Sequence, residues 1–129
     1  MGFTEFDALK AYARMMNTLD IQPIENLLAD DFVYESQNVF QALESKQEFI
    51  GYIVPKLQTI TRANAMVYAK MGTVAAYGRK QPCVILAQND KSNLVGIVLA
   101  KVEGERLKRL DLCVVPSPET AKRSGEYPM

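Results

Sequence analysis

The feature that most constrains the fold of this chain is a change in its hydrophobic periodicity near Arg62. Over much of the first half, apolar residues recur every three or four positions, as they do on one face of an α-helix. After Arg62 they alternate with polar residues or form short continuous runs, which is typical of β-strands. Helices followed by neighbouring strands predict an α+β fold, with the helices packed on one face of a curved antiparallel sheet.

Two helices are predicted at the start of the chain. Thr4 and Asp7 form the pattern of a capping box, and the apolar stripe that follows predicts an amphipathic helix ending near Thr18. A second, shorter helix is predicted over residues 23–29, because Ile24, Leu27 and Leu28 form an apolar side and Pro23 is tolerated in a first helical turn.

One strand and a third helix complete the first half. Residues 32–36 alternate in polarity and predict a strand, with residues 38–43 as its continuation or its partner. Ser45 and Glu48 form a second capping box that opens the third helix. Because a proline in a helix interior removes one hydrogen bond, Pro55 predicts a kink or an end just before it.

The strands of the second half are apolar on both faces, which predicts a partner for the sheet. Helices can cover only one side, so we expect a homodimer through the outer sheet face, around Ile85, Ile97 and Leu112. Two prolines end the last strand, and residues 116–129 are predicted to form a polar, mobile tail. The predicted strand segments are residues 63–70, 74–77, 83–89, 94–103 and 107–115.

Length and charge place the chain among single globular domains. Its 129 residues are predicted to form one domain, 1–129, with a core over about residues 4–115. A formal net charge of zero predicts no nucleic-acid partner and no membrane partner. The chain has neither the apolar length of a membrane span nor a signal-peptide pattern, so a cytoplasmic location is expected, with Cys83 and Cys113 reduced.

The chain contains no histidine, and this absence excludes several kinds of site. Ser-His-Asp and Cys-His nucleophile systems need an imidazole, and so do the common histidine-rich zinc sites. No glycine-rich phosphate loop is present either. We therefore expect no metal and no cofactor, and any chemistry must come from carboxylates, tyrosines, lysines or arginines.

The order of elements and the segment Ala-Asp-Asp-Phe-Val-Tyr-Glu at residues 29–35 resemble the nuclear-transport-factor-2-like superfamily, and within it the SnoaL-like and ketosteroid-isomerase-like branches. The resemblance implies a cone, in which a strongly bent sheet wraps around a helix and leaves a mostly apolar pocket at its open end. Members include isomerases, cyclases, hydrolases, dehydratases and non-catalytic binding proteins, so the resemblance points to a fold more than to a reaction.

The ketosteroid isomerases imply three positions in this chain. Their hydroxyl donor falls on Tyr12, their aspartate base on Ser36 and their protonated aspartate on Val98. Serine is no base without a partner, and valine donates no hydrogen bond. The resemblance therefore implies that isomerase activity by that mechanism is absent.

Five residues remain as site candidates. Glu35 is either a base inside the cone or a solvated carboxylate, and Asp111 with Arg109 forms either a polarising pair or a structural ion pair. Tyr12, Tyr34 and Tyr52 are predicted to line a pocket where the first and third helices meet the sheet.

Two functions follow from these candidates. The first is a binding protein for a small apolar molecule, which the substituted catalytic positions favour. The alternative is a cofactor-free enzyme of isomerase, cyclase or hydrolase type, acting on a small cyclic or carbonyl compound through Glu35 or Asp111 with Tyr12.

Overall fold

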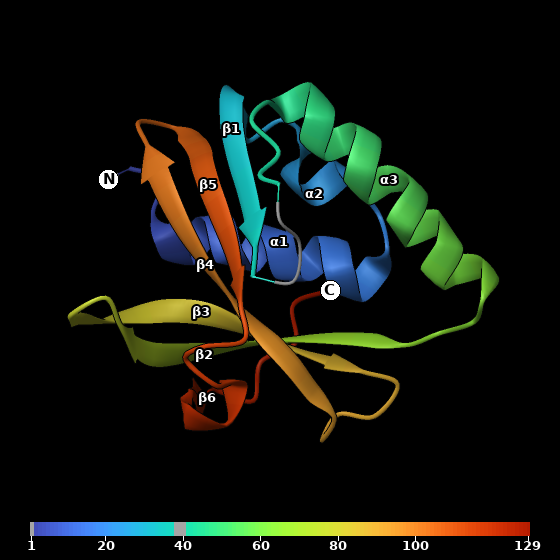
Figure 1. Ribbon diagram of the computed structural model, residues 1–129, viewed down its shortest axis with the longest axis vertical. Helices are drawn as coiled ribbons and strands as arrows, with labels where there is room; N and C mark the ends of the chain where they lie inside the picture. Colours follow the sequence, from blue (N-terminus) through green and yellow to red (C-terminus); the bar gives the residue numbers. More distant parts are fainter. Residues whose placement is uncertain (1, 38–40) are drawn as a thin grey trace.

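The computed structural model describes residues 2–37 and 41–129 and shows three helices packed against a strongly bent mixed sheet (Figure 1). The prediction of an α+β fold is confirmed. The sheet has the strand order β1-β5-β4-β3-β2-β6. The helices are α1 (Glu5–Thr18), α2 (Gln22–Glu25) and α3 (Lys46–Arg62), and the strands are β1 (Leu28–Ser36), β2 (Val67–Ala76), β3 (Arg79–Gln88), β4 (Leu94–Glu103), β5 (Arg106–Cys113) and β6 (Lys122–Arg123).

Strands β2 to β5 form an antiparallel meander, as the sequence predicts. The two segments predicted at residues 63–70 and 74–77 are one continuous strand, β2. Strand β1 differs from the prediction, because it joins the sheet parallel to β5, with Glu35 opposite Asp111. This long-range pairing makes the sheet mixed rather than wholly antiparallel. The predicted segment 38–43 lies partly outside the described residues, and its last residue, Leu43, forms an antiparallel bridge with Tyr34.

The first two helices differ in how well the sequence predicts them. The capping box of α1 is present, since the Thr4 side chain accepts from the Asp7 amide and the Asp7 carboxylate accepts from the Thr4 amide. Helix α2 is only one turn long and ends before the predicted residue 29. The reason is pairing with β5: the Leu107 amide donates to the Leu27 carbonyl at 2.7 Å, so the chain is already extended there.

Helix α3 continues through Pro55 to Arg62, so of the two expected outcomes, a kink or an end near Val54, the end is wrong. Pro55 and Gly51, one turn earlier, both lie on the exposed side of the helix. The Gly51 carbonyl, which loses its amide partner to the proline, therefore faces water instead of the core. Phe49, Ile53 and Leu57 form the buried stripe on the opposite side.

Each face of the sheet carries its own hydrophobic core. The larger core lies between the helices and the inner face and includes Phe32, Phe49 and Met15. The second lies on the outer face of β2 to β5, with Ala121 from the C-terminal segment. Its members are Val74, Ala76, Cys83, Ile85, Ile97, Leu99, Cys113 and Ala121.

Residues 117–129 cover part of the outer face and then bind the edge of the sheet, where the sequence predicts a mobile tail. The short helix η1 (Pro118–Thr120) packs on β4, and β6 pairs with β2. Beyond β6, the Met71 amide donates to the Glu126 carbonyl at 2.9 Å, and the Asn17 side-chain amide donates to the Pro128 carbonyl at 2.6 Å. Backbone hydrogen bonds thus hold a segment that is polar in composition.

Within residues 2–37 and 41–129, no helix combines the length and the apolar character that crossing a membrane requires.

Candidate functional site

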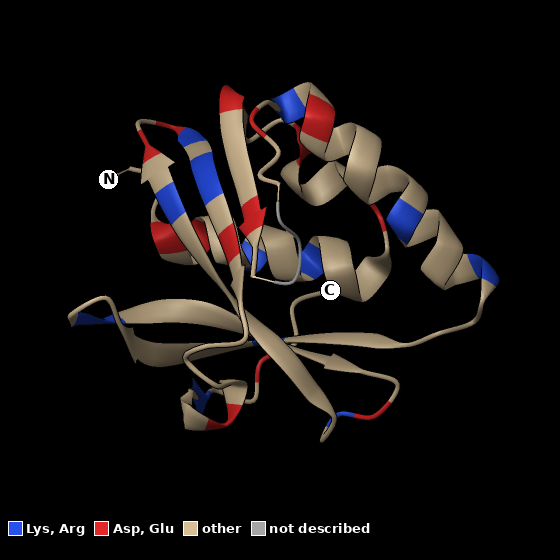
Figure 2. Cartoon of the chain, viewed as in Figure 1, with Lys and Arg blue, Asp and Glu red and all other residues tan. Residues whose placement is uncertain are grey.

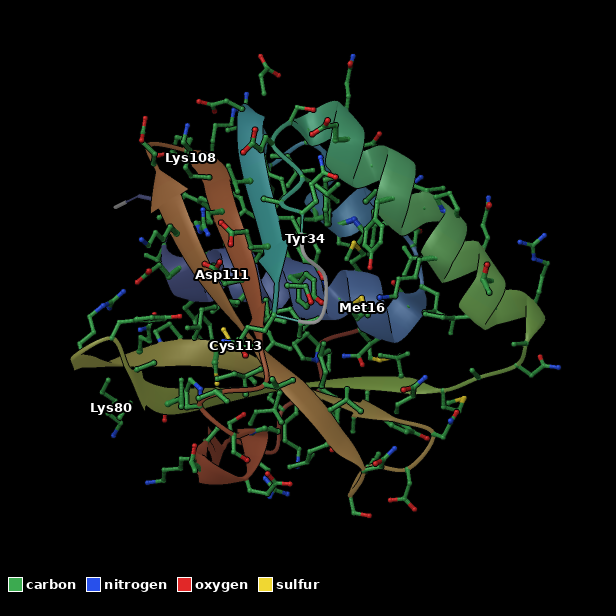
Figure 3. All side chains as sticks on the ribbon, viewed as in Figure 1. Met16, Tyr34, Lys80, Lys108, Asp111 and Cys113 are labelled. Atoms are coloured by element: carbon green, nitrogen blue, oxygen red, sulfur yellow. The ribbon has the colours of Figure 1, made fainter. Side chains whose placement is uncertain are left out.

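Four aromatic side chains meet on the inner face of the sheet, from three different elements. Tyr12 comes from α1, Tyr34 from β1, and Phe49 and Tyr52 from α3. The Tyr34 ring centroid lies 5.3 Å from that of Phe49 and 5.8 Å from that of Tyr52. Figure 3 shows Tyr34 projecting from β1 toward the helices. The structure therefore brings together the three tyrosines that the sequence proposes as ligand-binding residues.

Burial keeps the hydroxyls of Tyr12 and Tyr34 protonated. Burial raises the pKa of Tyr12 well above its ordinary value, and the neighbouring Tyr34 and Tyr52 raise it further. The pKa of Tyr34 is also raised, first by burial and then by Tyr52, against a smaller opposing effect of a hydrogen bond with Ser36. At neutral pH both are neutral phenols that can donate and accept hydrogen bonds but not act as bases.

The Tyr12 hydroxyl is the least satisfied group of the cluster. Only 3% of this residue is exposed, and no other described residue forms a hydrogen bond with its hydroxyl. Among the described residues, every side-chain nitrogen or oxygen that is fully sealed from solvent has a hydrogen-bond partner. The Tyr12 oxygen has none, so it is not fully sealed and adjoins space that a water-sized group can enter. The Tyr52 hydroxyl lies nearer the surface and accepts from Lys56 Nζ at 3.1 Å. The Tyr12 hydroxyl thus lies in the interior and the Tyr52 hydroxyl nearer the surface.

The positions implied by the isomerase resemblance also lie on this inner side. Tyr12, Ser36 and Val98 are all buried, and Val98 belongs to the inner core. Ser36 lies two residues after Tyr34 on the same face of β1. The side chain at the base position is therefore a buried hydroxyl beside tyrosines, with no carboxylate of its own.

Glu35 and Asp111 lie on the opposite, outer face of the sheet. The alternation along β1 directs Phe32, Tyr34 and Ser36 inward and leaves Glu35 exposed outward. The sheet therefore separates both carboxylates from Tyr12. The structure does not bring together the residues that the enzyme alternative combines.

Arg109 joins the two carboxylates into one ion-pair network. Its Nε lies 3.1 and 3.0 Å from the two Asp111 carboxylate oxygens, and its Nη2 donates to both Asp111 and Glu35. The Arg109–Asp111 pair inferred from the sequence is present. Figure 2 shows the blue and red segments of this network next to one another on β1 and β5. Because each carboxylate is paired with the same guanidinium, the arrangement ties β1 to β5 across their parallel edge.

A hollow of about 480 Å³ lies beside this network, and the sequence analysis missed it. Tyr77, at its mouth, has a backbone φ of 53° and is followed by Gly78 with a φ of 80°. Two successive positive φ values are typical of the tight turn that joins β2 to β3, and the glycine at position 78 is the sequence signal for that turn. Inside the hollow, Gln81 donates to the Ala76 carbonyl at 3.0 Å. Its wall consists of Tyr77, Arg79, Gln81, Leu99, Ala100, Lys101, Arg109 and Asp111.

Among the residues that the structure describes, no group of three or more histidine, cysteine, aspartate or glutamate side chains is placed to hold a metal ion.

Comparison with known proteins identifies the fold. No protein-family model matches the sequence, and no curated protein matches it. Among solved structures, an NTF2-like protein of unknown function from Cytophaga hutchinsonii is 13% identical, with a TM-score of 0.59 over 90% of this chain and 96% of that one. A putative polyketide cyclase from Sinorhizobium meliloti is also 13% identical, with a TM-score of 0.55 over 80% of this chain and 90% of that one.

A third solved structure adds the name of the fold. It is an NTF2-like protein with a cystatin-like fold from Novosphingobium aromaticivorans, 12% identical, with a TM-score of 0.55 over 88% of this chain and 81% of that one. At such low identities the likeness concerns the arrangement of the backbone. The chain therefore has the NTF2-like, cystatin-like fold, as its resemblance to that superfamily predicts.

Proposed function

We propose that the protein binds a small, largely apolar molecule at the inner tyrosines, between α1, α3 and β1. The observation that carries this proposal is the Tyr12 hydroxyl, which is buried yet has no hydrogen-bond partner among the described residues. Because this oxygen is not sealed from solvent-sized space, a ligand oxygen can reach it and form a hydrogen bond with it, worth about 0.5–1.5 kcal/mol. Apolar walls with few convergent polar groups are the usual composition of a small-molecule site.

Binding is favoured over catalysis because no base is found on the inner side among residues 2–37 and 41–129. Among the described residues, the buried polar or charged side chains are Ser36 and Gln81, and Gln81 is on the outer side. Tyr12 and Tyr34 are neutral, and the carboxylates of Glu35 and Asp111 lie across the sheet. A neutral ligand with one aromatic ring and one hydroxyl or carbonyl oxygen matches this composition best.

Replacing Tyr12 with Phe tests the proposal, because it removes the hydroxyl and keeps the ring. With naphthol as a neutral fluorescent probe, we expect affinity to fall by about 0.5–1.5 kcal/mol, the net contribution of one neutral hydrogen bond. The melting temperature should stay the same or rise, since the lost hydroxyl has no described partner. A fluorescence titration and a thermal melt of the same variant give both values.

Tyr77→Phe is the matched control, because it makes the same change at an exposed tyrosine on the outer side. Naphthol should bind this variant as it binds the unaltered protein. Equal binding to the Tyr12→Phe variant, combined with a lower melting temperature, would show that Tyr12 is an ordinary core residue.

We also propose a homodimer, with an interface displaced from the one that the sequence indicates. Ile85 and Ile97 are already buried within one chain, and Leu112 packs against the inner core. Near the end of β5, Val114 and Val115 remain exposed. Light scattering at micromolar concentration should give the mass of two chains and, for Val115→Glu, the mass of one. A single-chain mass for the unaltered protein would rule the dimer out.

A further inference from the structure

A second hollow, of about 360 Å³, lies where the first turn of α1 meets the β2–β3 hairpin and the C-terminal segment. Its volume is within the range of small-molecule sites. Phe6, Met71 and Pro82 form apolar parts of its wall, and Lys80 and Lys122 contribute positive charges. Arg123 also belongs to the wall, but as the strand neighbour of Lys122 it directs its side chain to the opposite face of the sheet. We call it the edge groove, because β6 and β2 form that edge of the sheet.

Strand register places two of the lysines on the same face of the sheet. Thr73 of β2 is opposite both Lys122 of β6 and Pro82 of β3, so these three side chains form one row across the strands. Lys80 lies two residues from Pro82 and therefore points to the same side. With neighbouring strands about 4.8 Å apart, both long side chains can reach one anionic group. Figure 3 shows Lys80 beside the β2–β3 turn.

Hydrogen bonds hold the cations of the C-terminal segment in this position. The Ser124 hydroxyl donates to the Met71 carbonyl at 2.8 Å, and the Ser124 amide donates to the same carbonyl at 3.0 Å. Lys122 and Arg123 thus belong to a segment fixed on β2 and are not on a free end.

The positive charge of the edge groove is not balanced by carboxylates. Within the described part of the chain, Lys80 and Lys122 form no ion pair. The acidic residue in the wall, Glu126, is already paired with Lys10 at 3.4 Å. Like charges in one hollow repel one another, and an anion relieves that repulsion.

The apolar part of the wall indicates which kind of group is attached to the anionic group of the ligand. Phe6 is on the first turn of α1 and 44% exposed, which is high for a phenylalanine. Its ring and Pro82 offer contact to an apolar body of a ligand, and the cations beside them suit a carboxylate.

We propose that the edge groove binds a small organic carboxylate with an aromatic or short alkyl body. The carboxylate lies between Lys80 and Lys122, and the body packs against Phe6 and Pro82. This site is separate from the inner tyrosines, and its test does not depend on them.

Phenylacetate and the neutral phenethyl alcohol, which have similar bodies, are the probes for a calorimetric titration. Phenylacetate should bind at least about tenfold more tightly than the alcohol, because hydrogen bonds to charged groups contribute about 1.5–3 kcal/mol. The double variant Lys80→Gln/Lys122→Gln should lose at least about tenfold of this affinity, and Phe6→Ala should lower it as well. Added salt should weaken phenylacetate binding but not binding of the alcohol.

Lys101→Gln is the matched control, since Lys101 is an exposed lysine in the other hollow. It should leave phenylacetate binding unchanged. Equal affinity for the acid and the alcohol, equal losses in Lys101→Gln and in the double variant, or no binding of phenylacetate at millimolar concentration would each overturn the proposal. Naphthol binding to the double variant should be unaltered, which distinguishes a failure here from a failure at the inner site.

Discussion

Raising the pH from 9 to 12 should destabilise the protein steeply, because its buried acids hold their protons more tightly when folded. Burial raises the pKa of Tyr12 and of Tyr34 above 10, and it raises the pKa of Cys83 from 9.0 to about 12. In the unfolded chain these groups ionise at their ordinary pKa values, so above those values the folded state binds more protons. The free energy of unfolding then falls with rising pH, by about 1.4 kcal/mol per pH unit for each group.

The size of this loss can be assigned to individual residues. The stability that these raised pKa values contribute is fully present below pH 9. For each group it is lost as the pH rises from the group's pKa in the unfolded chain to its pKa in the folded protein. Urea unfolding at closely spaced pH values measures the slope, and the Tyr12→Phe variant should have a shallower slope above pH 10. An unchanged slope in that variant would mean that the Tyr12 phenol ionises as readily in the folded protein as in the unfolded chain.

Replacing Gly72 with Ala should lower the free energy of unfolding by about 1–3 kcal/mol, the usual cost of overpacking. A Cβ atom at this position would lie 2.6 Å from the Lys122 carbonyl oxygen and 2.7 Å from Ile85 Cδ1. The Lys122 carbonyl belongs to the backbone of β6, so it cannot move without disturbing the pairing with β2. Part of the loss should therefore appear as detachment of residues 117–129.

Gly51→Ala is the matched control for this substitution. Nothing lies within 4 Å of a Cβ placed on Gly51, which is exposed in α3, so alanine there should raise stability by about 1 kcal/mol. Limited proteolysis should cut the C-terminal segment faster in Gly72→Ala and at the unaltered rate in Gly51→Ala. Similar unfolding curves for both variants would show that β6 tolerates displacement.

Local signals explain why much of the fold could be predicted from the sequence. The capping residues Thr4 and Ser45 start α1 and α3 as expected, because their side chains bond amides only three residues away. The parallel pairing of β1 with β5 joins residues far apart in the chain, and no local pattern encodes it. The C-terminal segment escaped prediction for a related reason: its backbone supplies most of the bonds that hold it, whereas composition reports on side chains.

The sequence predicts which way the helical residues of the candidate site point, but not which way its strand residues point. Tyr12 and Tyr52 lie on the inward sides of two amphipathic helices, and helical periodicity alone predicts that they face the sheet. Strand residues are different, because the strands of this sheet are apolar on both faces. Alternation shows that Tyr34 and Glu35 point in opposite directions, but not which of them points toward the helices.

Residues 117–129, which cover part of the outer core, are synthesised after the strands that they cover, and this order has a consequence for the newly made protein. A chain is made from its N-terminus, so all four strands that form the outer core emerge before residues 117–129. Until that segment arrives, Ile97 and Leu99 belong to an apolar surface without its cover. The newly made protein thus passes through an interval in which strands β1 to β5 are present but the outer core can associate with other apolar surfaces, and the synthesis of residues 117–129 ends that interval.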